Sequence, residues 1–260
     1  MSYEEFLRNK AITAPPCGIP HPPELSDKLF RFQADICRWA LRRGRAAIWA
    51  DCGLGKSWMA LEWARVVYEH TRRPVLILTP LAVAAQFVDE ARKLGIEGVA
   101  QIREPEQQGN AIDACNYDRL HKLDLSIYGG VVLDESSILK DYASATRNTV
   151  IEGFARTPFR LACTATPAPN DYMELGNHSE FLGALTRTEM LSTFFVHDGG
   201  DTSQWRLKGH AQRDFWTWLT SWAVALRSPA DLGYDASGYD LPPLSLRHIT
   251  TETDHSKAAA

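Results

Sequence analysis

Short runs of hydrophobic residues alternate with longer segments of helical periodicity over most of the chain. The short runs are predicted as strands, at residues 46–50, 75–79, 98–102, 112–116, 131–134 and 160–164. The segments with helical spacing are predicted as helices, at residues 26–43 (with Ser26 as the N-cap), 56–70, 82–94, 145–154 and 171–182. Strands that are apolar throughout and interleaved with helices indicate a parallel sheet covered on both faces. We therefore predict an α/β fold whose ligands bind at the carboxyl ends of the strands.

The two ends of the chain depart from this alternation. Residues 1–25 are rich in proline and are predicted as an extended arm. A tryptophan-rich helix is predicted at 210–226, between a weak apolar stretch at 190–200 and a loop rich in Gly, Asp and Pro at 228–243. Residues 245–251 alternate like the first strand of a further domain, so we expect the sequence to stop shortly after a hinge. The prediction has four parts: an N-terminal arm at 1–25, an α/β lobe at 26–185, a helical extension and hinge at 186–244, and the start of a second lobe at 245–260.

Composition narrows the class of protein. Hydrophobic residues make up 45% of the 260 residues, which is ample for a core, and no apolar run reaches the roughly 18 residues that a membrane span needs. The five cysteines lack C-x-x-C spacing, which favours free thiols in a reducing cytoplasm over disulfides or a metal site. The N-terminus has no signal-peptide pattern. Because the net charge is −4, contact with nucleic acid requires a local basic patch or a partner.

Residues 50–57 read Ala-Asp-Cys-Gly-Leu-Gly-Lys-Ser, between a predicted strand and a predicted helix. Gly53 and Gly55 allow backbone amides to turn toward a polyphosphate, which the N-terminus of the following helix also attracts. Lys56 can reach the β- and γ-phosphates, and the Ser57 hydroxyl can ligate Mg²⁺. Ala50 stands where the full G-x-x-x-x-G-K-[ST] pattern has its first glycine. Since Gly-Lys-Ser also occurs in ordinary surface turns, this loop alone leaves both interpretations open.

A second candidate element is the apolar run Val131–Leu133, which ends in the two carboxylates Asp134 and Glu135. Asp134 is suited to hold Mg²⁺ directly or through a water, and Glu135 to orient and deprotonate an attacking water. A strand that simply ends in solvated acids is the alternative. Because the pair occurs together with Lys56, we predict an ATPase site with ATP and Mg²⁺ as cofactors.

Besides the loop at 50–57, five motifs of the chain resemble, in the order in which they occur, those of the first RecA-like lobe of superfamily-two helicases, particularly the Swi/Snf-type branch of DNA translocases. The five resembling segments are 29–33 (the Q motif), 78–81 with 86–87 (motif Ia), 116–117, 134–141 and 160–170. The resemblance covers about residues 26–250. It implies a RecA-like P-loop NTPase with a C-terminal helical extension, and a second RecA-like lobe in the full-length protein. Segment 171–181 is similar to versions in phage and prophage members, which suggests a phage or bacterial origin.

The resemblance also implies roles for single residues. Gln33 would contact the adenine base, with Phe30 or Phe32 near it; the alternative is a partly buried glutamine at a helix start. Ser137 replaces the histidine that in the family relays the nucleotide state toward the segment from Thr164 to Thr166. The residues expected to face nucleic acid are Thr79, Pro80, Asn116 and Tyr117.

Residues 205–222 interleave tryptophans with cations and allow two interpretations. Aromatic and basic side chains together can stack bases and follow a phosphate backbone. Phe215, Trp218 and Trp222 fall at helical spacing, however, which favours a packed helix face. His70 and His178 are predicted as surface histidines, and Trp58 and Trp63 as core residues.

The motifs are considered against three possible functions of the protein. The leading prediction is an ATP-dependent helicase or translocase acting on nucleic acid, with duplex DNA favoured because the resemblance is closest to duplex translocators. The alternative is a nucleotide-sensing module that binds a protein partner without motor activity, which the acidic balance and the absence of a second lobe would support. A small-molecule kinase is disfavoured, because the acidic pair and the Thr164–Pro167 segment match water activation rather than a substrate hydroxyl pocket.

Overall fold

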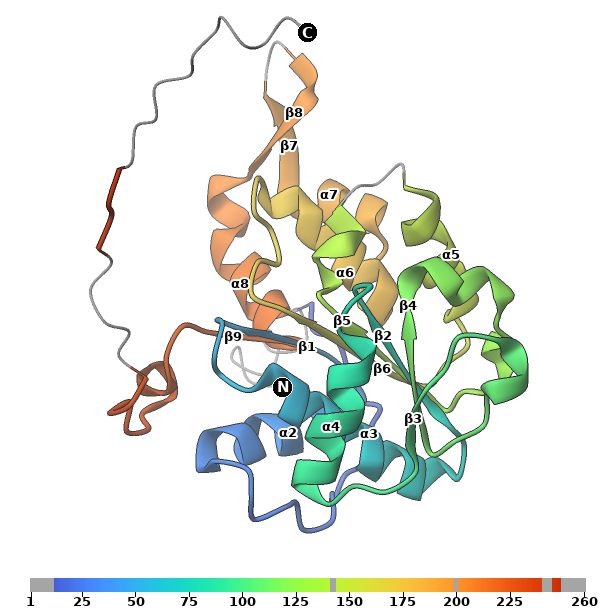
Figure 1. Ribbon diagram of the computed structural model, residues 1–260. Coiled ribbons are helices and arrows are strands. Elements are labelled where there is room, and N and C mark those ends of the chain that lie inside the picture. The colour runs from blue at the N-terminus through green and yellow to red at the C-terminus, as the bar shows by residue number, and fades with distance from the viewer. Residues whose placement is uncertain (1–11, 141–143, 199–200, 240–244, 249–260) are drawn as a thin grey trace, which may run out of the picture.

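The protein is built on a twisted, fully parallel sheet (Figure 1). The computed structural model describes residues 12–140, 144–198, 201–239 and 245–248. The sheet has seven strands in the order β3-β4-β2-β5-β6-β1-β9. The strands are β1 (Arg45–Ala50), β2 (Val75–Thr79), β3 (Val99–Gln101), β4 (Ile112–Asn116), β5 (Gly130–Asp134), β6 (Phe159–Thr164) and β9 (Ala223–Leu226). This arrangement confirms the predicted α/β class.

Helices cover both faces of the sheet, as predicted. In the strands of the sheet other than β3, alternate residues enter two separate cores, because successive side chains of a strand point to opposite faces. In β1, Ile48 belongs to one core and Trp49 to the other. The first core is completed by α2 (Arg31–Arg43), α3 (Lys56–Thr71) and α4 (Ala84–Leu94), and the second by α5 (Ala145–Gly153), α6 (Leu175–Leu182), α7 (Arg187–Phe194) and α8 (Gln212–Thr220).

The connections include short 3₁₀ helices and one hairpin. The hairpin pairs β7 (Phe195–Asp198) with β8 (Asp201–Leu207) in antiparallel fashion and projects away from the sheet beyond α7 (Figure 1). The 3₁₀ helices are η1 (Pro105–Gln107), η2 (Tyr117–Lys122), η3 (Leu125–Ile127), η4 (Ser136–Lys140), η5 (Tyr172–Glu174), η6 (Gly209–Ala211) and η7 (Pro229–Leu232).

The described part of the predicted N-terminal arm is held against the end of α2. The amides of Cys17, Gly18 and Ile19 donate to the carbonyls of residues 43, 42 and 41. A Cβ on Gly18 would lie 2.0 Å from the Leu41 carbonyl oxygen and 2.4 Å from the Gly44 nitrogen. Only glycine permits so close an approach of two backbones.

Two predictions for single elements are wrong. The first helix begins at Arg31, with Phe30 as its N-cap. Ser26 opens a turn instead: its carbonyl accepts from the Leu29 amide at 3.2 Å, and its own amide donates to Glu62 Oε1 at 2.8 Å. The helix predicted over 210–226 ends at Thr220, and residues 223–226 form β9, since the free edge of β1 offers them a ladder of backbone partners. The weak apolar stretch at 190–200, for which no element is predicted, divides over its described residues 190–198 into the end of α7 and strand β7.

Residues 245–248 have no regular secondary structure. The rest of the strand predicted there, and Asp141 at the end of the predicted acidic motif, lie outside the described residues.

Candidate nucleotide site

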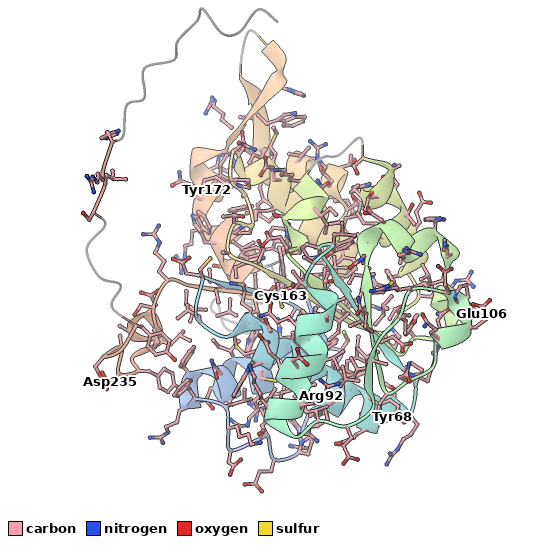
Figure 2. The ribbon with its side chains drawn as sticks, in the orientation of Figure 1. Tyr68, Arg92, Glu106, Cys163, Tyr172 and Asp235 are labelled. Carbon is pink, nitrogen blue, oxygen red and sulfur yellow. The ribbon has the colours of Figure 1, made fainter. Side chains whose placement is uncertain are left out.

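Three neighbouring strands bring the predicted chemistry to one edge of the sheet. Strand β6 lies between β1, which leads into the glycine-rich loop, and β5, which ends at Asp134 and is followed directly by Glu135. Thr164 pairs in register with Trp49 on one side, and Cys163 pairs with Asp134 on the other. Cys163, near the centre of the molecule in Figure 2, is buried, which raises the pKa of its thiol; Asp134 acts in the same direction and Lys56 in the opposite one. The loop and the acidic pair therefore lie one strand apart.

The loop has the backbone that a phosphate cradle needs. Gly53 and Gly55 have φ of +82° and +75°, and Gly55 is the N-cap of α3. A Cβ on Gly53 would meet nothing within 4 Å, so the space above this glycine is open. Lys56 Nζ donates to the carbonyl oxygens of Ala50 at 2.8 Å and Asp51 at 3.1 Å. The ammonium thus stays at the loop, and Ser57 follows it on the first turn of α3.

Gln33 connects α2 to this loop. Its side chain is 3% exposed; Oε1 accepts from the Phe30 amide at 3.0 Å and Nε2 donates to the Leu54 carbonyl at 3.0 Å. Gly55 is needed here, because a Cβ would lie 2.3 Å from Gln33 Nε2. Phe30 is 62% exposed beside the ring of Tyr239, 6.2 Å away. The structure thus places Gln33 against the loop, and its contact with a base stays a prediction.

The acidic pair has an unusual electrostatic environment. Burial raises the pKa of Asp134 to about 6; the Glu135 carboxylate acts in the same direction and Lys56 in the opposite one. A carboxylate that is costly to ionise without a partner is suited to a cation ligand. With the open loop, Lys56 and the Ser57 hydroxyl, the donor set fits a triphosphate with Mg²⁺.

Glu135 is the centre of a chain of hydrogen bonds. Its backbone is left-handed, with φ of +58°. Its Oε1 accepts from Thr164 Oγ1 at 2.7 Å and from Ser137 Oγ, and the Thr166 amide donates to Thr164 Oγ1 at 3.0 Å. The structure therefore brings together all three residues for which a coupling role is predicted, Ser137, Thr164 and Thr166.

His178 is not a surface histidine, and that prediction is wrong. The ring is fully buried and its Nε2 shares a hydrogen bond of 3.0 Å with Ser136 Oγ. Burial lowers the pKa of His178 to about 4, so the ring is neutral at pH 7. The sequence carried a signal for this position, because Leu175, His178 and Leu182 share one helix face. His70 is exposed, as predicted.

The four predicted nucleic-acid residues line a cleft of about 260 Å³ beside the acidic pair. Thr79 is fully buried, and Tyr117 is 6% exposed with its hydroxyl donating to the Asp134 carbonyl at 2.9 Å. A nucleic-acid strand in this cleft would therefore contact other side chains than those of Thr79 and Tyr117. The more accessible lining residues are Pro80, Leu81, Asn116, Asp118, Ser137, Ile138 and Lys140.

The tryptophan-rich helix packs as predicted. Phe215, Trp218 and Trp222 are buried in the second core. Trp216, on the opposite face of α8, is 42% exposed and contacts Tyr172 at 5.4 Å, the surface residue labelled in Figure 2. Trp63 is fully buried as predicted, whereas Trp58 is half-buried at the edge of the first core.

Comparison with solved structures identifies the fold. The chain is similar to the SWI2/SNF2 ATPase core of Sulfolobus solfataricus in complex with dsDNA, with TM-score 0.65 and 18% identity over 80% of this chain and 46% of that chain. It is also similar to the Hef helicase domain of Pyrococcus furiosus (TM-score 0.52, 16% identity, 61% and 38% covered). For the UvsW helicase of bacteriophage T4 the TM-score is 0.51, with 15% identity and 72% and 66% covered.

The chain therefore has the RecA-like α/β fold of superfamily-two helicase cores. It spans less than half the length of the first two of these structures. No protein-family model and no curated protein matches the sequence. Among the described residues, no helix combines the length and apolar character of a membrane span.

Proposed function

We propose that the chain is the ATP-hydrolysing lobe of a nucleic-acid motor of the helicase or translocase type, acting on duplex DNA. The observation that carries the proposal is the convergence of the Lys56 loop, Asp134 and the Glu135–Thr164 hydrogen bond at the ends of β1, β5 and β6. Superfamily-two helicase cores have the same fold, which supports it.

Each group has a defined part in this proposal. The amides of Gly53 and Gly55 and the Lys56 ammonium bind the phosphates, and Ser57 and Asp134 hold the metal. Mg²⁺–ATP supplies the phosphoanhydride bond to be hydrolysed and the cation that neutralises its charge. Glu135, held by Thr164, orients the attacking water and accepts its proton.

Two further elements belong to the proposal. The cleft at Pro80, Leu81, Asn116 and Lys140 receives the nucleic-acid backbone; the SWI2/SNF2 structure in complex with dsDNA supports a duplex. A second RecA-like lobe in the full-length protein closes the ATP site. Because such a lobe contributes an arginine worth about 10³–10⁵ in rate, this chain alone should hydrolyse ATP slowly. The cytoplasmic location and the phage or bacterial origin stay predictions.

Nucleotide titration tests the ATP site. Wild-type protein should bind a fluorescent ATP analogue in the presence of Mg²⁺. Lys56→Ala should weaken this binding at least about tenfold, because it removes a charged hydrogen-bond donor. Lys93→Ala, an exposed lysine on α4, is the control and should bind like wild type. Equal affinity of Lys56→Ala and wild type would refute the site.

The nucleotide-sensing module remains a second candidate, favoured by the burial of Thr79 and Tyr117 and by the net charge of −4. Mobility shifts with a duplex oligonucleotide at about 50 and 200 mM salt separate the two. Binding that weakens steeply with salt supports the motor, since phosphate contacts release counterions. Absence of binding at both concentrations supports the sensor.

A further inference from the structure

Two adjacent residues of α6 hold the segment that follows the acidic pair. Asn177 Nδ2 donates to the Leu139 carbonyl at 2.6 Å, and His178 Nε2 shares its hydrogen bond with Ser136 Oγ at 3.0 Å. Asn177 is 1% exposed, and His178 and Ser136 are fully buried. Both contacts end on η4, the 3₁₀ helix that begins directly after Glu135.

His178 also contacts the strand that leads into the glycine-rich loop. Its ring lies edge-on to Trp49 of β1, with centroids 5.7 Å apart. It therefore packs between β1 and η4, the two elements adjoining the two halves of the candidate site. The sequence does not reveal this arrangement, because 42 positions separate Ser136 from His178.

The conformation of Glu135 needs such support. A left-handed backbone is uncommon for a residue with a side chain, and it persists where the surroundings fix it. The Glu135 carboxylate reaches Thr164 from this conformation. Its backbone is continuous with η4, whose first residue, Ser136, is anchored by His178.

We propose that Asn177 and His178 are positioning residues that fix η4 against α6, and so hold Glu135 in its left-handed conformation with its carboxylate on Thr164. Neither touches the reacting atoms; they act through Ser136 and Leu139. The catalytic consequence rests on the proposed function, whereas the clamp itself can be measured without nucleotide.

The alternative is that these buried polar contacts only stabilise the fold, and the neighbouring residue provides a control. Ser179 is fully buried on the same helix; its Oγ donates to the Leu185 carbonyl at 2.6 Å and accepts from the Leu185 amide at 2.9 Å. Ser179→Ala therefore removes buried hydrogen bonds from α6 without touching η4.

Hydrogen exchange measured by mass spectrometry tests the clamp. In His178→Leu and in Ser136→Ala, which changes little volume, peptides covering residues 135–140 should exchange about tenfold faster than in wild type. His178→Gln, which keeps a side-chain amide for Ser136, should restore part of the protection. Ser179→Ala should leave these peptides unchanged. Unchanged exchange in His178→Leu and Ser136→Ala, or equal acceleration in Ser179→Ala, would overturn the proposal.

A double-mutant cycle on nucleotide turnover tests the consequence. His178→Leu, Ser136→Ala and the double variant should lose turnover by the same factor, about tenfold, with unchanged affinity for ATP, because all three remove one interaction. Additive losses, or a loss of affinity alone, would contradict the positioning role. If wild-type protein neither binds nor hydrolyses ATP, the proposed function fails, while the exchange experiment still decides on the clamp.

Discussion

The half-buried Asp134 carboxylate leads to a quantitative prediction about folding. Its pKa rises from 3.8 to about 6 in the folded protein, mainly through burial, so the folded state binds this proton more tightly than the unfolded chain. The stabilisation from this protonation is complete below pH 3.8 and is lost as the pH rises through 6. At neutral pH the ionised, metal-free carboxylate therefore destabilises the protein.

The magnitude follows from the same values. One pKa unit corresponds to about 1.4 kcal/mol, so the difference between 3.8 and about 6 gives at most about 3 kcal/mol at pH 7.5. Because the side chain is only partly buried, solvent screening reduces this to about 1–3 kcal/mol. The asparagine variant Asp134→Asn has a similar shape and no charge, so it should be more stable than wild type by that amount.

Urea unfolding of metal-free protein at pH 4 and pH 7.5 provides the assay. The advantage of Asp134→Asn should fall below about 1 kcal/mol at pH 4, where wild type is itself protonated in the folded state. The lowered pKa of His178 destabilises both proteins as the pH falls from 6.5 toward about 4, and cancels in the comparison. Asp118→Asn, at an exposed carboxylate, is the control and should have no such pH-dependent advantage. An advantage of Asp134→Asn that is equal at both pH values would refute the reasoning.

Three further predictions concern packing and the site. Gly18→Ala should lower the free energy of unfolding by at least about 2 kcal/mol, because the new Cβ would lie 2.0 Å from the Leu41 carbonyl oxygen. Gly209→Ala, whose Cβ would meet nothing within 4 Å, should cause no such loss, and urea unfolding measures both variants. Trp63→Ala should lower the free energy of unfolding by about 3–5 kcal/mol, and Trp216→Ala, at an exposed residue, by less than about 1 kcal/mol. Thermal unfolding measures both losses, and equal losses would contradict the prediction. Thr164→Val removes the donor to Glu135 and should slow phosphate release about tenfold with ATP affinity unchanged; a loss confined to affinity would argue against the role of this hydrogen bond.

Much of the fold was predictable from local sequence. Six of the seven strands of the sheet fall where apolar runs occur, because a strand covered on both faces must be apolar throughout. The place of the glycine-rich loop and of the acidic pair was also predictable, because each lies at the carboxyl end of such a strand. Parallel strands bring their carboxyl ends to one edge of the sheet.

The seventh strand was not predictable in this way. Residues 223–226 continue the apolar spacing of α8, and only the free edge of β1 makes them a strand. Similarly, the sequence placed Thr79 and Tyr117 at the correct strand ends but could not say how far each side chain is buried. Burial depends on the neighbouring strands and loops, which come from distant parts of the chain.

The sequence by itself determined the class of fold, the order of its motifs and the edge of the sheet where they meet, because these depend on periodicity and on short spacings. Only the tertiary structure decided the partners of the acidic pair and of the segment that follows it. The bonds from Thr164 to Glu135 and from His178 to Ser136 join residues 29 and 42 positions apart. Such contacts are selected by packing of whole elements, which local patterns do not encode.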